Sequence, residues 1–163
     1  MKTKVSSKAL LSEDDIWNAM LSAYGQYNFP TDNEKANDVF IVFNYFCELE
    51  SGGHESLFNW LSEHIEKMGI TTYLNTLTKI LGQIGADHYA KIEMTYGKKL
   101  WEAYIALENS NIKEPDYLNL EADFYKLIEK ADGEYRKLGE ELGELLQKYA
   151  VTIYTEIIEV VEE

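Results

Sequence analysis

Apolar residues recur at intervals of three or four positions along almost the whole chain, and this spacing is the feature that most restricts its fold. A spacing of this kind places one apolar stripe on each successive α-helix, whereas a half-buried strand requires alternation at every second residue. We find no alternating segment and no internal repeat. The sequence therefore predicts an all-α fold, a single globular bundle of about seven helices with a long C-terminal helix.

Capping and helix-breaking residues divide the chain into these helices. Ser12, followed by three acidic residues, is typical of a helix N-terminus. Gly52 and Gly53 predict a tight turn between the second and third helices, Gly85 ends the fourth, and Gly133 separates the sixth from the seventh. The predicted core is a single cluster of apolar residues from the second to the fifth helix: Phe40, Phe43, Phe46, Leu61, Leu77, Ile84 and Ile92.

The last helix is predicted to continue to the C-terminal end of the apolar pattern. Its stripe consists of Tyr135, Leu138, Leu142, Leu145, Tyr149 and Ile153. Residues 151–161 are rich in β-branched side chains that favour strands by propensity, so helix and strand both stay open there, and we expect helix. On a helix these apolar side chains would cover more than half of the circumference, which is more than one contact with the core requires. We therefore expect the remaining apolar surface to form the contact of a homodimer.

The length of 163 residues predicts one domain over 1–163, in which residues 1–11 are expected to be flexible. Aromatic residues make up 13% of the chain, enough to build a core despite the charge. Cys47 is the single cysteine, so no internal disulfide can form, and its apolar neighbours predict a buried side chain. Only a short apolar stretch follows the N-terminal lysines, too short for a signal peptide, and we expect a cytoplasmic protein.

The chain lacks the residue patterns of known catalytic and metal sites. His54, His64 and His88 have no second histidine or cysteine one helical turn away, so surface or capping positions are expected for all three. Carboxylate pairs adjacent in sequence point about 100° apart on a helix and make poor ligand sets. The prediction is therefore that the protein is not an enzyme, with no catalytic residue, no metal ligand and no cofactor.

The net charge of −14 is concentrated in the last third of the chain. Residues 1–101 contain 13 acidic and 9 basic residues, whereas residues 102–163 contain 16 acidic and 6 basic residues. A negative field of this kind repels nucleic acids and anionic membranes and attracts basic proteins. Solubility alone is the simpler explanation of the charge. The residues predicted to bind a basic partner are Asp116, Glu121, Asp123, Glu129, Glu140, Glu141 and Glu144.

Three segments stand out in the order Glu48–Asn59 with its Gly-Gly pair, Leu77–Ile92 with an Ile-Gly-Ala landmark, and Leu120–Tyr125. Together they resemble a bacterial domain family that includes a DNA-mimic protein. The resemblance extends over about residues 36–153, and His54 stands where an aromatic residue is commoner in the family. It implies an all-α fold and, for some members, mimicry of DNA, and its landmarks contain no catalytic set.

Several functions stay open at this point. The first is an acidic protein that occupies the DNA-binding surface of a transcription factor or another basic protein. The second is an immunity or antitoxin-like protein that neutralises a basic toxin by the same electrostatic attraction. An enzyme with an unrecognised site and an unspecified scaffold are the remaining alternatives. The identity of the partner does not follow from the sequence.

Overall fold

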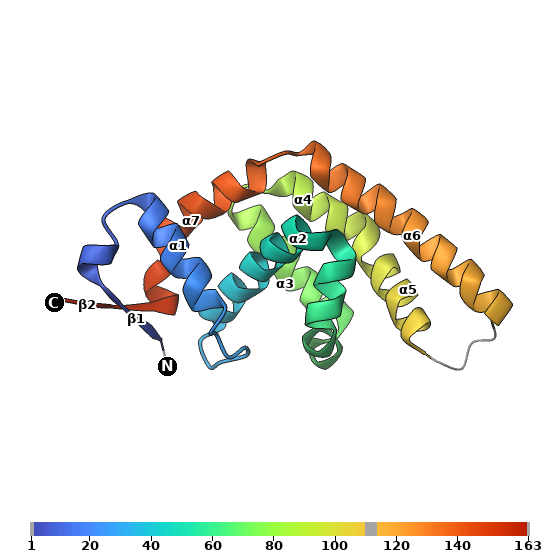
Figure 1. Cartoon of the computed structure of the whole chain (residues 1–163), viewed down its shortest axis with the longest axis horizontal. Coiled ribbons are helices and arrows are strands. Elements are labelled where there is room, and N and C mark those ends of the chain that lie inside the picture. Colours follow the sequence, from blue (N-terminus) through green and yellow to red (C-terminus); the bar gives the residue numbers. More distant parts are fainter. Residues whose placement is uncertain (1, 110–113, 163) are drawn as a thin grey trace. The chain divides into compact units, whose positions relative to one another are not determined.

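The computed structural model describes residues 2–109 and 114–162, and most of them are helical (Figure 1). The all-α prediction is confirmed. The predicted number of seven helices is close but does not match in detail, because several breaks lie elsewhere. The chain divides into two compact units: unit 1 comprises Met1–Phe46 and Glu140–Glu163, and unit 2 comprises Cys47–Gly139. The expectation of a single domain over 1–163 stays a prediction.

Unit 1 contains α1 (Glu13–Tyr24), the first part of α2 (Glu34–Met68) and α7 (Glu141–Ile157). Ser12 and Asp15 form a capping box in which each side chain accepts a hydrogen bond from the other residue's backbone N–H, which confirms the predicted start of α1. α1 packs along α7. The stripe predicted through Leu145 and Tyr149 is wrong, because both are only half-buried. The buried residues of α7 are Leu142, Leu146, Ala150, Ile153 and Ile157.

The two ends of the described chain form a small parallel sheet (Figure 1). Strand β1 (Thr3–Ser6), which is followed by the short 3-10 helix η1 (Ser7–Ala9), pairs with β2 (Ile158–Val161). The prediction of a helix through residue 161 is therefore wrong, whereas the flexibility of residues 1–11 stays a prediction. Ile158 is 1% exposed in its extended conformation. Burial of this side chain and pairing with β1 favour the strand that its β-branched neighbours allow.

Unit 2 contains the second part of α2, then α3 (Ile70–Gln83), α4 (Asp87–Ile92), the π-helical segment η2 (Glu93–Gly97), α5 (Lys98–Glu108) and α6 (Glu114–Lys137). α3 packs on α4, and α5 packs on α6. Its largest fully buried side chains are Tyr73, Tyr89, Leu57, Ile65, Leu77, Leu81 and Leu100.

The break between the last two helices lies six residues beyond the predicted one. Gly133 lies inside α6, and the chain turns at Gly139, where φ is 64° and α7 starts at Glu141. The buried positions Ala131 and Tyr135 continue the apolar stripe on both sides of Gly133. Packing of this stripe outweighs the cost of a helical glycine, which is only about 0.5–1 kcal/mol. The prediction of one long C-terminal helix from Tyr135 is therefore wrong.

The predicted core residues are divided between the units. Phe40, Phe43 and Phe46 belong to unit 1, and the other four belong to unit 2. Phe43, Leu61, Leu77 and Ile92 are buried, whereas Phe40, Phe46 and Ile84 are only partly buried. Phe40 stacks on the ring of Phe29 at the surface side of α2, with ring centroids 4.7 Å apart. The prediction of burial is therefore wrong for three of these residues.

No helix among residues 2–109 and 114–162 has the length and apolar character needed to cross a membrane.

Candidate functional site

The predicted acidic residues lie at accessible positions, but they do not form one row. Glu140, Glu141 and Glu144 belong to unit 1, at the start of α7, where Glu140 and Glu144 are exposed. The remaining acids, Asp116, Glu121, Asp123 and Glu129, lie on α6 in unit 2. With 3.6 residues per turn, Asp116 and Asp123 share one flank of α6, while Glu121 lies on nearly the opposite flank. The structure therefore divides the predicted set between the two units, and within α6 it spreads the acids over more than one flank.

Glu121 is part of a surface of unit 2 that sequence reasoning did not identify. The Tyr125 hydroxyl donates a hydrogen bond of 2.9 Å to Glu55 Oε1 on α2. That bond, burial of part of the phenol, and the charges of Glu55 and Glu121 raise the pKa of Tyr125. Tyr117 also lies close to Tyr125. Two acids from α2 and α6 therefore converge on one tyrosine.

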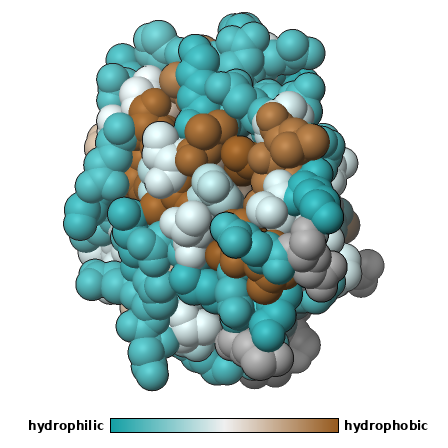
Figure 2. All heavy atoms as spheres, turned by 90° about the vertical axis from the view of Figure 1, so that its left-hand side faces the viewer, coloured by the Kyte–Doolittle hydropathy of each residue, from teal (hydrophilic) through white to brown (hydrophobic). Residues whose placement is uncertain are grey.

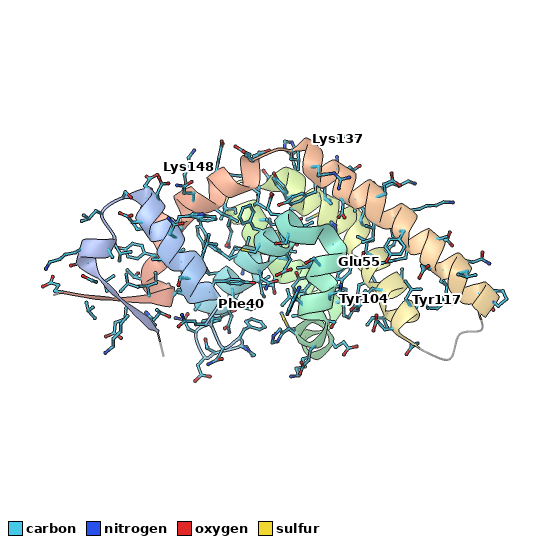
Figure 3. The ribbon with its side chains drawn as sticks, viewed as in Figure 1. Phe40, Glu55, Tyr104, Tyr117, Lys137 and Lys148 are labelled. Atoms are coloured by element: carbon cyan, nitrogen blue, oxygen red, sulfur yellow. The ribbon has the colours of Figure 1, made fainter. Side chains whose placement is uncertain are left out.

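The same surface continues onto α5. Tyr104 donates a hydrogen bond of 3.3 Å to Asn59 Oδ1 on α2. Burial, together with the charges of Glu108, Glu55 and Glu66, raises the pKa of the Tyr104 phenol. Figure 3 labels Glu55, Tyr104 and Tyr117 on the three helices that contribute. We call this surface the tyrosine–glutamate face; it consists of Glu55, Glu66, Glu108, Tyr117, Glu121 and Tyr125, together with Tyr104, which is buried with an exposure of 8%.

A buried histidine between two carboxylates is the second feature that sequence reasoning missed. His54 is 0% exposed, so its predicted surface or capping position is wrong. Its Nδ1 lies 2.6 Å from Asp132 Oδ1 on α6, and its Nε2 lies 2.5 Å from Glu93 Oε1 on η2. Asp132 Oδ1 also accepts a hydrogen bond of 3.1 Å from the His54 backbone N–H and thus caps the part of α2 that follows Gly53.

The environment of His54 favours its charged form. Burial opposes protonation, but the charges of Glu93 and Asp132 and their hydrogen bonds outweigh burial and raise the pKa of His54 to about 10. The imidazolium then donates from both ring nitrogens, one to each carboxylate. Because both nitrogens are engaged and the ring is buried, His54 cannot take a proton from a bound substrate. His54, Glu93 and Asp132 therefore form a buried charged cluster that links α2, η2 and α6, and we call this cluster the tie.

Two glycines allow the acids of this tie to approach the backbone. The axis of α2 breaks at Gly52 and Gly53, where Gly53 has a φ of 70°. A Cβ on Gly53 would lie 2.1 Å from Asp132 Oδ2, so a side chain at this position would displace the carboxylate. In η2, a Cβ on Gly97 would lie 2.7 Å from Leu74 Cδ2 and 3.2 Å from Glu93 Oε2. The third predicted turn glycine, Gly85, follows α3 with a φ of 85°.

π-helical segments often occur at functional sites, and η2 begins at Glu93. The side chain of Glu93 is 2% exposed and directed at His54. In the described part of the chain, no group of three or more His, Cys, Asp or Glu side chains is arranged to hold a metal ion. No local sequence pattern distinguishes His54 from a surface histidine, because its partners lie 78 and 39 positions away in the chain.

Comparisons with family models, curated proteins and solved structures find no match to this chain. The resemblance to the family that includes a DNA mimic therefore stays a prediction.

Proposed function

We propose that this protein binds a basic protein segment through the tyrosine–glutamate face of unit 2, and that the acids at the start of α7 attract basic proteins to unit 1 independently. The observation that carries the proposal is the convergence of Glu55, Glu121 and Tyr125 on one surface of unit 2. Carboxylates beside an accessible ring such as that of Tyr125 suit lysine and arginine side chains, which gain both ion pairing and cation–π attraction.

The exposure of Tyr125 supports this proposal. Tyr125 is 46% exposed, and the apolar Leu118, two helical turns earlier on α6, is 57% exposed. Aromatic anchors that bury on binding contribute much of the affinity in protein interfaces, whereas single exposed charges contribute only about 0–1 kcal/mol each. The charges would therefore mainly accelerate association, and the tyrosines would mainly slow dissociation.

The nature of the captured partner decides between the narrower functions. Capture of a DNA-binding protein in competition with its DNA would make the protein a DNA mimic. Capture of a basic toxin would make it an immunity or antitoxin-like protein. Both narrower proposals predict a non-catalytic cytoplasmic protein that requires no cofactor, and both use the same electrostatic steering.

Two triple variants with equal loss of charge test the proposal. The partner is first identified by pull-down, and its association rate is then measured at several salt concentrations. We expect Glu55→Gln, Glu66→Gln and Glu121→Gln together to slow association several-fold and to reduce its dependence on salt, since the screening length is about 8 Å at physiological salt. A Tyr125→Phe variant keeps the ring and serves as the control for the hydroxyl.

The second triple variant changes Glu140, Glu141 and Glu144 to glutamine. We expect a smaller decrease in association rate, because these residues belong to unit 1 and lack the tyrosines. If neither triple variant changes the association rate or its salt dependence, the acids serve solubility only and the proposal is wrong.

A further inference from the structure

A polar cavity opens beside the break in α2, and it is separate from the tyrosine–glutamate face. Its volume is about 420 Å³, within the range of small-molecule sites. Gly52 and Gly53 form part of its wall and contribute no side chain that would fill it. The other lining residues are Leu49, Glu50, Ser51, Asp132, Tyr135, Arg136 and Gly139.

In each of the two carboxylates of this cavity, Glu50 and Asp132, one oxygen accepts a hydrogen bond and the other is available to a ligand. Glu50 Oε1 accepts a hydrogen bond of 2.9 Å from the Tyr135 hydroxyl, and Asp132 Oδ1 is occupied by His54. Among residues 2–109 and 114–162, no hydrogen bond engages Glu50 Oε2 or Asp132 Oδ2. The side chain of Asp132 is 12% exposed, so it joins the buried tie to the cavity.

One cation lies at the same cavity. Arg136 is exposed and follows Asp132 by one helical turn on α6, yet within the described chain the pair forms no ion pair within 4.0 Å. A guanidinium presents several N–H donors suited to a carboxylate. The cavity thus presents acceptors for a cation and a donor group for an anion.

We propose that this cavity binds a free α-amino acid, a zwitterion whose ammonium group contacts Glu50 and Asp132 and whose carboxylate contacts Arg136. A ligand with only a positive charge would leave the guanidinium of Arg136 without a partner and be repelled by it. A ligand with only a negative charge would be repelled by both carboxylates. Leu49 and the ring of Tyr135 provide the apolar wall for the side chain of the ligand. This inference does not rest on the proposed partner binding.

The test is a titration of the whole ¹⁵N-labelled chain followed by NMR. Glycine, L-serine, L-glutamate and L-lysine are added separately, and methylammonium and acetate serve as probes of a single charge. We expect saturable shifts of the Gly52 and Gly53 amide signals with at least one amino acid. The affinities for methylammonium and for acetate should each be at least about tenfold weaker than the affinity for that amino acid. Saturable binding of methylammonium as tight as that of every amino acid would overturn the proposal, as would the absence of saturable shifts with all four amino acids.

Two neighbouring bases provide a matched pair of variants. We expect Arg136→Gln to weaken binding of the best amino acid about tenfold while leaving methylammonium binding unchanged or stronger. Lys137→Gln removes the same charge from the next residue, which does not line this cavity, and should retain the affinity. Equal effects of the two variants, or no effect of Arg136→Gln, would refute the assignment of the carboxylate contact. Both positions are exposed, so the circular dichroism of both variants should match that of the parent chain.

Discussion

Gly53 shows how one residue without a side chain determines the surroundings of the buried histidine. Its φ of 70° is in the left-handed region, which costs other residues about 1–2 kcal/mol. The same glycine leaves the space in which Asp132 reaches both the backbone N–H and the ring of His54. Conformation and close approach therefore require glycine at this position.

Replacing this glycine should be costly. We expect Gly53→Ala to decrease the free energy of unfolding by about 2 kcal/mol or more, because the left-handed strain adds to the displacement of Asp132. Urea denaturation followed by circular dichroism measures the change.

Gly133→Ala is the matched control. This glycine lies inside α6, and a Cβ there would meet nothing within 4 Å, so we expect stabilisation of about 0.5–1 kcal/mol. Equal effects of both substitutions would contradict the role assigned to Gly53.

The charged state of His54 makes stability depend on pH. The pKa of His54 is about 10 in the folded chain and about 6.5 in an unfolded chain, so folding binds a proton between these values. The stabilisation by this proton is fully present below about pH 6.5 and is lost as pH rises toward 10. We therefore expect the free energy of unfolding to decrease between pH 7 and pH 9, and NMR at pH 8 should show both ring nitrogens of His54 protonated.

A variant of Glu93 separates this effect from other titrations. Burial and the charges of Glu48 and Glu50 raise the pKa of the Cys47 thiol to about 11, which also lowers stability as pH rises. Glu93→Gln keeps a hydrogen-bond acceptor but removes one charge beside His54. The loss of stability should then be smaller and should end at a lower pH, because the pKa of His54 in the folded variant is lower. An unchanged pH profile in this variant would show that His54 is neutral in the parent chain.

At the scale of elements, pairing between distant segments overrides local helical preference at the C-terminal end. α7 ends at Ile157 and the next residue is extended, although the apolar spacing continues. The strand partner, β1, begins at Thr3. A two-stranded sheet is weak without further packing, and Ile158 provides that packing by its burial in unit 1.

Removing β1 should therefore release β2. We expect a chain that starts at Ser7 to show faster hydrogen exchange at Glu159, Val160 and Val161, because their pairing partners are absent. Amides of α3, which lies in unit 2, serve as the internal reference and should exchange at the parent rate. Protection of β2 that survives the truncation would show that it does not depend on β1.

At the scale of the whole molecule, the fold redistributes the acidity seen along the chain. Unit 1 contains 13 acidic and 5 basic residues, a net charge of −8, and unit 2 contains 16 acidic and 10 basic residues, a net charge of −6. The acids of the last third of the chain thus belong to both units. Both units therefore carry a net negative charge, and the tyrosine–glutamate face belongs to unit 2.

The apolar surface available for a second subunit is smaller than the sequence predicted. Ile153, Ile157 and Ile158 are buried within unit 1, whereas Val160 is 39% exposed and Leu11 is 82% exposed. Figure 2 views the side that carries β1 and β2 and shows brown apolar side chains among the teal surface. A homodimer stays our expectation, and the exposed Val160 and Leu11 are the remaining candidates for its contact.

Sedimentation velocity measures the assembly state. We expect a particle of about twice 18.8 kDa at micromolar concentration, and Val160→Glu should convert it to a monomer, because the new charge would be buried in the contact. Asn75→Glu, an equal change of charge at an exposed position of α3, should leave the dimer intact. A parent chain that sediments as a monomer contradicts the expectation.

The sequence by itself determined the features that depend on neighbours within a few residues. The helical period, the helix start at Ser12 and the helix-breaking pair before His54 are local patterns, and the structure has helices and breaks at these positions. The acidity of the chain likewise follows from composition.

Only the tertiary structure decided which distant residues meet. The carboxylates that contact His54 lie 78 and 39 positions away in the chain, and β1 pairs with a strand at the opposite end. A polar residue on an amphipathic helix has the same local pattern whether water or a buried acid lies opposite. Its burial is decided by packing between helices, as is the continuation of α6 through Gly133, because these contacts outweigh local propensities of about 1 kcal/mol.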